Sequence, residues 1–194
     1  MQQVEVTIPY VESRNRGTVA VRLILAIPHI LLTGIWQYAV QIASVVQWFI
    51  ILFTGKRNEG IWNFTNRWLA YASRTYNYLG LMFDEYPGFI DDQGKTPVVY
   101  SSAYSSEANR LTNALRLFWA IPAVIIMMLL ATAGYVLTII CWFAIVITGS
   151  MPRGMFDFLL KAHRYAIQAN AYTTLMTDTY PKYGDAPAGL VTTA

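Results

Sequence analysis

The chain has 194 residues and a formal net charge of +3, and 55% of its residues are hydrophobic while only 13% are charged. Soluble domains carry about a quarter charged residues, so this composition argues against a soluble protein and predicts an integral membrane protein. The single cysteine, Cys141, excludes an internal disulfide and a cysteine-based metal site.

A short alternating stretch opens the sequence. Val4, Val6, Ile8 and Tyr10 would lie on one side of an extended strand, and residues 96–100 form a weaker copy of it. We expect the two strands to pair and so to tie the halves of the chain together. The polar and charged leader before the first apolar run is not typical of a cleavable signal peptide.

The first apolar run, residues 19–54, has no formal charge after Arg22. Apolar runs longer than about 18 residues are typical of membrane spans, but one helix of this length would measure about 54 Å against a hydrocarbon core of about 30 Å. Basic residues flank the run on both sides, and the positive-inside tendency places both flanks in the cytoplasm. The pattern favours a hairpin of two short transmembrane helices that turns near Gly34 and Gln37, with a helix kink at Pro28.

The next segment, residues 60–84, has apolar and aromatic residues on one helical face and polar residues on another. This pattern predicts an amphipathic helix in the headgroup plane, which we expect to end at the Asp-x-Tyr-Pro motif because proline stops a helix. Basic residues beside the spans and on such helices are expected to contact lipid headgroups. In the whole chain these are Lys56, Arg57, Arg67, Arg74, Arg153, Lys161 and Arg164.

The second half repeats the first at an offset of 94 positions, without a gap over residues 15–87 and with about a third of the positions identical. The repeat predicts a second hairpin over about 112–148, kinked at Pro122 and turning near Thr132 and Gly134, and a second interfacial helix over about 154–178. The expected fold is an all-α membrane protein, a tandem repeat of transmembrane helical hairpin plus interfacial amphipathic helix, with short N-terminal strand segments. Unit one covers residues 1–90, unit two covers 91–184 and opens with an acidic linker at 91–95, and 185–194 form a flexible tail.

Two arginines and two aspartates recur at this offset. Arg22 and Arg116 lie near the expected membrane boundary, and Asp84 and Asp178 close the two units. We expect Arg22 to pair with Asp84, and Arg116 with Asp178, as structural ion pairs between hairpin and interfacial helix. Charge reversal at Asp84 should then lower the folding yield, and reversal of Arg22 as well should restore it.

His29 is the candidate cofactor ligand, because an imidazole at membrane depth could bind a haem iron or a chlorophyll magnesium. Its counterpart in unit two is Ala123, so the favoured interpretation is a hydrogen-bonded packing residue. His163, beside Arg164, is interpreted as a headgroup-facing cation. The sequence has no phosphate loop, nucleophile elbow or zinc spacing, and no acidic residue inside the apolar arms. We therefore expect a protein that is not an enzyme and that binds neither metal nor nucleic acid.

Three motifs carry a resemblance to a known family: R-L-x-x-A-I-P, W-F-x4-T-G-x4-G and D-x-Y-P, each present in both halves. They resemble a family of uncharacterised bacterial membrane proteins known as a domain of unknown function, often in tandem copies. The resemblance covers residues from about 15 to 183 and implies a location in the bacterial inner (cytoplasmic) membrane, without an activity. Unit two departs from it after the Thr-Gly turn, where Pro152 and Arg153 replace Asn58 and Glu59.

These observations predict a multi-pass protein with both termini in the cytoplasm. It would be a non-catalytic accessory or structural subunit of a larger bacterial membrane complex, such as a respiratory or photosynthetic electron-transfer assembly. Its partners would be membrane lipids and other integral membrane subunits. Two alternatives remain open: a lipid-organising or membrane-curvature protein, and a haem- or chlorophyll-binding protein that uses His29.

Overall fold

The computed structural model describes residues 4–90 and 96–184. Its elements in chain order are β1 (Val4–Thr7), α1 (Arg16–Thr54), α2 (Glu59–Leu79), β2 (Val99–Ser102), α3 (Arg110–Thr148) and α4 (Arg153–Thr173). The predicted linker at 91–95 and tail at 185–194 lie outside the described residues.

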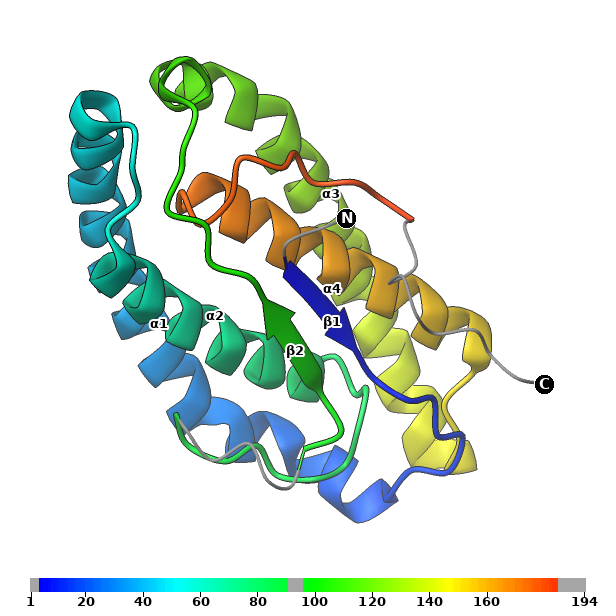
Figure 1. Ribbon diagram of the computed structural model, residues 1–194. Helices are drawn as coiled ribbons and strands as arrows, with labels where there is room; N and C mark the ends of the chain where they lie inside the picture. Colours follow the sequence, from blue (N-terminus) through cyan, green and yellow to red (C-terminus); the bar gives the residue numbers. More distant parts are fainter. Residues whose placement is uncertain (1–3, 91–95, 185–194) are drawn as a thin grey trace.

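The elements form three layers (Figure 1). The ribbon of β1 and β2 packs on α2 and α4, and these two helices pack in turn on α1 and α3. Seen from the strand side, α1 and α3 curve around opposite rims of the molecule, and the start of each lies beside the end of the other. The prediction of a mostly helical fold with a small pair of strands is confirmed.

The two strands pair with each other, as the sequence predicted. The pairing is antiparallel. Val4, Val6 and Ile8 are all buried, because alternate residues of β1 point to the α4 side of the ribbon. The second strand begins three residues later than predicted, at Val99. In the register of the pair, Val6 lies opposite Tyr100.

The predicted hairpins are wrong, because each apolar run forms one continuous helix. α1 and α3 each have 39 residues, or about 58 Å at 1.5 Å per residue. Around Gly34, the predicted turn, the residues between Pro28 and Gly55 include no proline and no left-handed glycine. An isolated helical glycine costs only about 1 kcal/mol, too little to end a helix that is apolar on both sides of it.

Asparagine caps begin both long helices, and glycines end them. The side chain of Asn15 accepts hydrogen bonds from the backbone N–H groups of Gly17 and Thr18, and Asn109 accepts one from Thr112. Gly55 and Gly149 end the helices in the left-handed conformation, with φ of 73° and 79°. Pro28 and Pro122 both lie inside their helices.

α2 and α4 end several residues before the Asp-x-Tyr-Pro motif, so the predicted ends at 84 and 178 are wrong. The terminator is a leucine in the left-handed conformation, Leu81 in unit one (φ 62°) and Leu175 in unit two (φ 65°). After the first helix, Met82 N donates to Asn77 O at 3.0 Å and Leu81 N donates to Tyr78 O at 3.1 Å, the bonding of a Schellman motif. This turn sends the following chain, and Asp84 with it, back toward the start of α1.

The two units pack about an internal twofold axis. Val6 pairs with Tyr100, its own counterpart 94 positions later, so the axis passes between these residues and perpendicular to the ribbon. Matched hydrogen bonds between the units repeat the symmetry: Arg14 N to Gly149 O (2.9 Å) and Ala108 N to Gly55 O (3.0 Å), and Trp142 Nε1 to Val19 O (3.0 Å) and Trp48 Nε1 to Asn113 O (2.9 Å).

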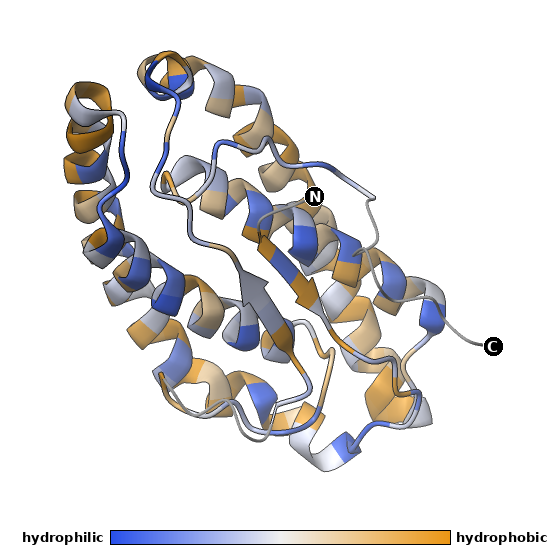
Figure 2. Ribbon diagram, in the orientation of Figure 1, coloured by the Kyte–Doolittle hydropathy of each residue, from blue (hydrophilic) through white to orange (hydrophobic). Residues whose placement is uncertain are grey.

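Only one narrow stripe of α1 is buried. Its members are spaced three, four or seven residues apart and face α2 and α3: Val19, Arg22, Ala26, His29, Thr33, Val40, Gln47 and Ile51. The rest of the helix surface is apolar and largely exposed, and α3 is alike (Figure 2).

Candidate functional site

Two ion clusters, one in each unit, connect the start of a long helix to the segment after the shorter helix. In the first ion cluster (Arg14, Asn15, Arg22, Tyr78 and Asp84), Arg22 Nη2 lies 2.7 Å from Asp84 Oδ1. The other carboxylate oxygen of Asp84 accepts the backbone N–H of Asn15 at 2.8 Å. The guanidinium of Arg22 also donates to Tyr78 O and lies 4.5 Å from the centre of the Tyr78 ring. The buried charge is thus surrounded by a carboxylate, a carbonyl and an aromatic face.

The second ion cluster (Arg57, Asn109, Arg116, Tyr172 and Asp178) repeats this arrangement. Arg116 pairs with Asp178 and lies 4.5 Å from the centre of the Tyr172 ring. Asn109 N donates to the second oxygen of Asp178 at 3.0 Å. The structure therefore brings together both arginine–aspartate pairs that the repeat pointed to.

A second arginine enters each cluster from a different place in the sequence. In the first cluster Arg14 donates to Met82 O at 2.7 Å, and its counterpart in unit two is Ala108. In the second cluster Arg57 of unit one reaches across to Asp178 at 2.6 Å, and the counterpart of Arg57 is Met151. Each aspartate thus has a second cation nearby, but the two cations are not related by the repeat.

Sequence analysis missed Arg14 and Arg57 as members of these clusters. The available signal was the loss of both arginines in unit two, where small or apolar residues replace them.

The second cluster also shifts the pKa of its carboxylate. Burial of Asp178 opposes ionisation, but the backbone N–H of Asn109 and the guanidinium groups of Arg57 and Arg116 outweigh it. They hold the pKa of Asp178 below its ordinary value, so the carboxylate is ionised at neutral pH.

The basic residues predicted to contact headgroups differ in their exposure. Arg57 and Arg74 are buried, with 4% and 3% exposure, because Arg57 pairs with Asp178 and Arg74 donates to Ile90 O. Headgroup contact is therefore the wrong role for these two. Lys56, Arg67, Arg153 and Lys161 are exposed.

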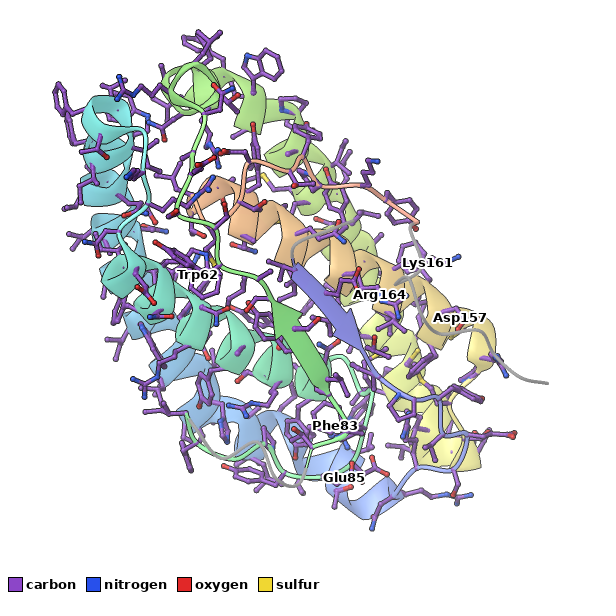
Figure 3. All side chains as sticks on the ribbon, viewed as in Figure 1. Trp62, Phe83, Glu85, Asp157, Lys161 and Arg164 are labelled. Atoms are coloured by element: carbon purple, nitrogen blue, oxygen red, sulfur yellow. The ribbon has the colours of Figure 1, made fainter. Side chains whose placement is uncertain are left out.

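Arg164 is partly buried at the ribbon. Its Nε donates to Val6 O in β1 at 2.8 Å. Figure 3 shows Asp157, Lys161 and Arg164 following one another along α4, with Arg164 nearest β1. Arg164 therefore helps to hold the ribbon on α4.

His29 is fully buried between α1, α2 and the segment after α2. Its Nδ1 lies 2.6 Å from the hydroxyl of Tyr71, and its ring stacks on Phe89 with centroids 4.6 Å apart. The edge of Tyr86 packs against it at 4.9 Å. The ring is thus covered by aromatic neighbours, which favours packing over ligation of a tetrapyrrole.

His163 is not placed as a headgroup-facing cation. Its Nδ1 lies 2.8 Å from Asn77 Oδ1, and the Asn77 amide donates to Ser73 O, so Nδ1 of His163 is the donor. Burial lowers the pKa of His163 to about 4. The histidine is therefore neutral at pH 7 and joins α4 to α2.

The clusters can hold the units in place, and their groups are already engaged in ion pairs and hydrogen bonds to the backbone. Over residues 4–90 and 96–184, no three His, Cys, Asp or Glu residues gather closely enough to hold a metal ion. The charged residues of the two clusters thus connect the starts of the long helices to the segments after α2 and α4.

The fold and its clusters define a class: a tandem-repeat helical protein with an internal twofold axis and two exposed helices that are long and apolar enough to cross a membrane. The chain belongs to the family described as Domain of unknown function (DUF4389), whose model matches twice, over residues 16–91 and 110–183. Comparison with curated proteins and with solved structures gave no match.

Proposed function

We propose that this protein is a non-catalytic accessory component of a larger membrane complex, to which α1 and α3 offer an apolar surface. The exposure of the two helices supports this proposal. In their most apolar stretches of 18 residues, the protein itself buries only 28% of α1 and 6% of α3. Apolar surfaces beyond a few hundred Å² mark contact with membranes or other proteins.

The two ion clusters support a structural role rather than a catalytic one. Their arginines donate hydrogen bonds to carboxylates and backbone carbonyls. The backbone N–H groups of Asn15 and Asn109 donate to the second oxygen of each carboxylate. Groups engaged in this way hold the long helices against the rest of the protein, and so keep the apolar surface in one shape.

Purification from native membranes in a mild detergent, followed by mass analysis, tests the proposal. We expect integral membrane subunits in a fixed ratio to the protein, and Tyr135→Ser on the exposed side of α3 to reduce that ratio. Lys161→Ala, on the polar side of α4, is the matched control and should leave the ratio unchanged. A monodisperse particle without a co-purifying subunit would contradict the proposal.

A lipid-organising protein is the second candidate, because the apolar surface lies in one layer and the strand ribbon lies in the opposite one. A body that inserts from one side widens one leaflet more than the other. Remodelling of liposomes by the pure protein would favour this candidate. The pigment-binding alternative gains no support from the enclosed ring of His29, and an absorbance spectrum of the purified protein would test it.

A further inference from the structure

We infer that α1 and α3 lie along one leaflet of the membrane, with both ends of each helix on the same aqueous side, and do not cross the bilayer. The inference rests on the proposed function: the protein works in a membrane, where the subunits of the complex cover only part of the apolar surface of these helices and the acyl layer covers the rest. It replaces the expected multi-pass arrangement with insertion from one side. The apolar surface of α1 and α3 then contacts the acyl layer of a single leaflet.

The first argument comes from the twofold axis. The axis places the starts of α1 and α3 at one height along its direction, and their ends at one height. The start of α1 also touches the end of α3, because Trp142 near that end donates to Val19 O. All four helix ends therefore lie at about the same height, and each helix runs roughly perpendicular to the axis, as Figure 1 shows in a view from the strand side.

The second argument fixes the axis relative to the membrane. The layers along the axis run from the ribbon through α2 and α4 to α1 and α3. If the axis lay in the membrane plane, the ribbon and the exposed sides of α2 and α4 would sit at the same depth as the apolar helices. Asn63, Arg67, Asp157 and Lys161 are exposed on these two helices, and charged side chains in hydrocarbon are strongly disfavoured. The axis therefore stands along the membrane normal, with the ribbon toward water.

The third argument comes from the distribution of charge along α1. Arg16 at its start and Lys56 just after its end are both exposed, whereas residues 23–53 between them carry no formal charge. α3 is alike, with Arg110 as its first residue and Arg153 after its end. Charged ends and a charge-free middle fit a helix whose ends reach the headgroups and whose middle lies against acyl chains. By the positive-inside tendency, this side faces the cytoplasm.

Single-cysteine variants of the full chain test the inference in a Cys141→Ser background. Glu12→Cys and Glu59→Cys mark the two ends of α1, and Ser101→Cys marks the ribbon; all three native residues are exposed. Tyr38→Cys and Ile42→Cys mark the middle of α1, where both residues are 70% exposed. Ser106→Cys, the counterpart of position 12, is the matched control for the symmetry.

The variants are expressed in a bacterial membrane and treated with an impermeant maleimide, on spheroplasts and on inverted vesicles. Positions 12, 59, 101 and 106 should all react from one and the same side. A spin label at positions 38 and 42 should collide with oxygen rather than with a water-soluble relaxant, at a depth of less than half the hydrocarbon core.

Other results would separate the possible failures. Reaction of positions 12 and 59 from opposite sides would overturn the inference and leave the membrane function standing. Spin labels exposed to water would overturn the inference and the proposed function together. Labels shielded from both oxygen and the water-soluble relaxant would show that protein, not lipid, covers the middle of α1, and would overturn its contact with the acyl layer.

Discussion

At the scale of single residues, the carboxylate of Asp84 does two jobs at once. It neutralises Arg22, which is only 1% exposed, and it accepts the backbone N–H of Asn15 at the start of α1. The side chain of Asp84 is 25% exposed. If it were removed, water could hydrogen-bond the backbone N–H of Asn15 but could not neutralise the charge of Arg22.

We expect Asp84→Ala to lower the free energy of unfolding by about 3 kcal/mol, since it leaves a buried arginine without its counter-ion. Thermal unfolding in a mild detergent measures this. Glu85→Ala is the control, because Glu85 is the exposed neighbouring carboxylate on the same segment (Figure 3) and its loss should cost less than about 0.5 kcal/mol. Equal effects of the two substitutions would sink the explanation.

His163 makes stability depend on pH in a defined window. Its pKa of about 4 in the folded protein lies below the ordinary value of 6.5, so the folded protein binds this proton less readily than the unfolded chain. The unfolding free energy should therefore decline as the pH falls from about 6.5 to about 4. His163→Gln should flatten this part of the profile. If the slope persisted in the variant, another group would be responsible.

Asp178 acts in a more acidic window, since its folded-state pKa lies below the ordinary value of 3.8. Its contribution is complete above that value and is lost as the pH falls further. Asp178→Asn removes this titration but leaves the His163 window, so the two groups can be separated in one pH series.

At the scale of elements, two glycines at the junction of α3 and α4 have opposite requirements. Gly149 has φ of 79°, and a Cβ there would lie 2.9 Å from Nε of Arg16 in the other unit. Gly154 lies in the first turn of α4 with open space around it.

Gly149→Ala should destabilise the protein by about 1–2 kcal/mol, because alanine is strained in the left-handed region. Gly154→Ala should stabilise it by about 0.5 kcal/mol, because alanine is the better helix former. Unfolding curves of the two variants, compared with wild type, check both signs. A stabilising Gly149→Ala would contradict the assigned turn.

Much of the element order was predictable because it depends on local patterns. The alternation of Val4, Val6 and Ile8 predicted β1, the helical spacing after Gly60 predicted α2, and the repeat transferred both predictions to unit two. The arginine–aspartate pairs were also within reach, since residues that recur together in two copies point to a contact in each. For His29, the counterpart Ala123 pointed to packing rather than ligation, and the aromatic enclosure of the ring agrees with that interpretation.

The predictions that failed depended on the tertiary structure. Length and flanking charge favoured a hairpin, but each run forms one continuous helix, and the start of each long helix lies beside the end of the other. The ends of α2 and α4 were missed because leucine, at Leu81 and Leu175, rarely takes the left-handed conformation. The cross-unit role of Arg57 depends on an interface between the units, which the spacing within one unit does not show.

At the scale of the whole molecule, the units are interlocked rather than strung together. The turn after each long helix bonds the leader of the other unit, through Arg14 N to Gly149 O and Ala108 N to Gly55 O. In addition, a tryptophan of each long helix donates a hydrogen bond to a backbone carbonyl of the other long helix. Each unit therefore depends on the other to satisfy these hydrogen-bonding groups.

We expect two fragments, 1–90 and 96–194, to co-purify as a one-to-one complex when they are produced together in the same membrane. Each fragment alone should aggregate or be degraded, because its apolar and hydrogen-bonding surfaces lack their partner. Differently tagged fragments and a tandem affinity purification measure this. Stable, monomeric accumulation of either fragment alone would show that the units fold independently.

Because Arg14 and Arg57 occur only in the first half, neither half of the chain can take the place of the other. A pair of first halves would crowd three guanidinium groups around each aspartate, whereas a pair of second halves would leave each aspartate with Arg116 alone. At these two clusters the copies are therefore no longer interchangeable. Restoring interchangeability would take coordinated changes on both sides, so each copy now constrains how the other can drift.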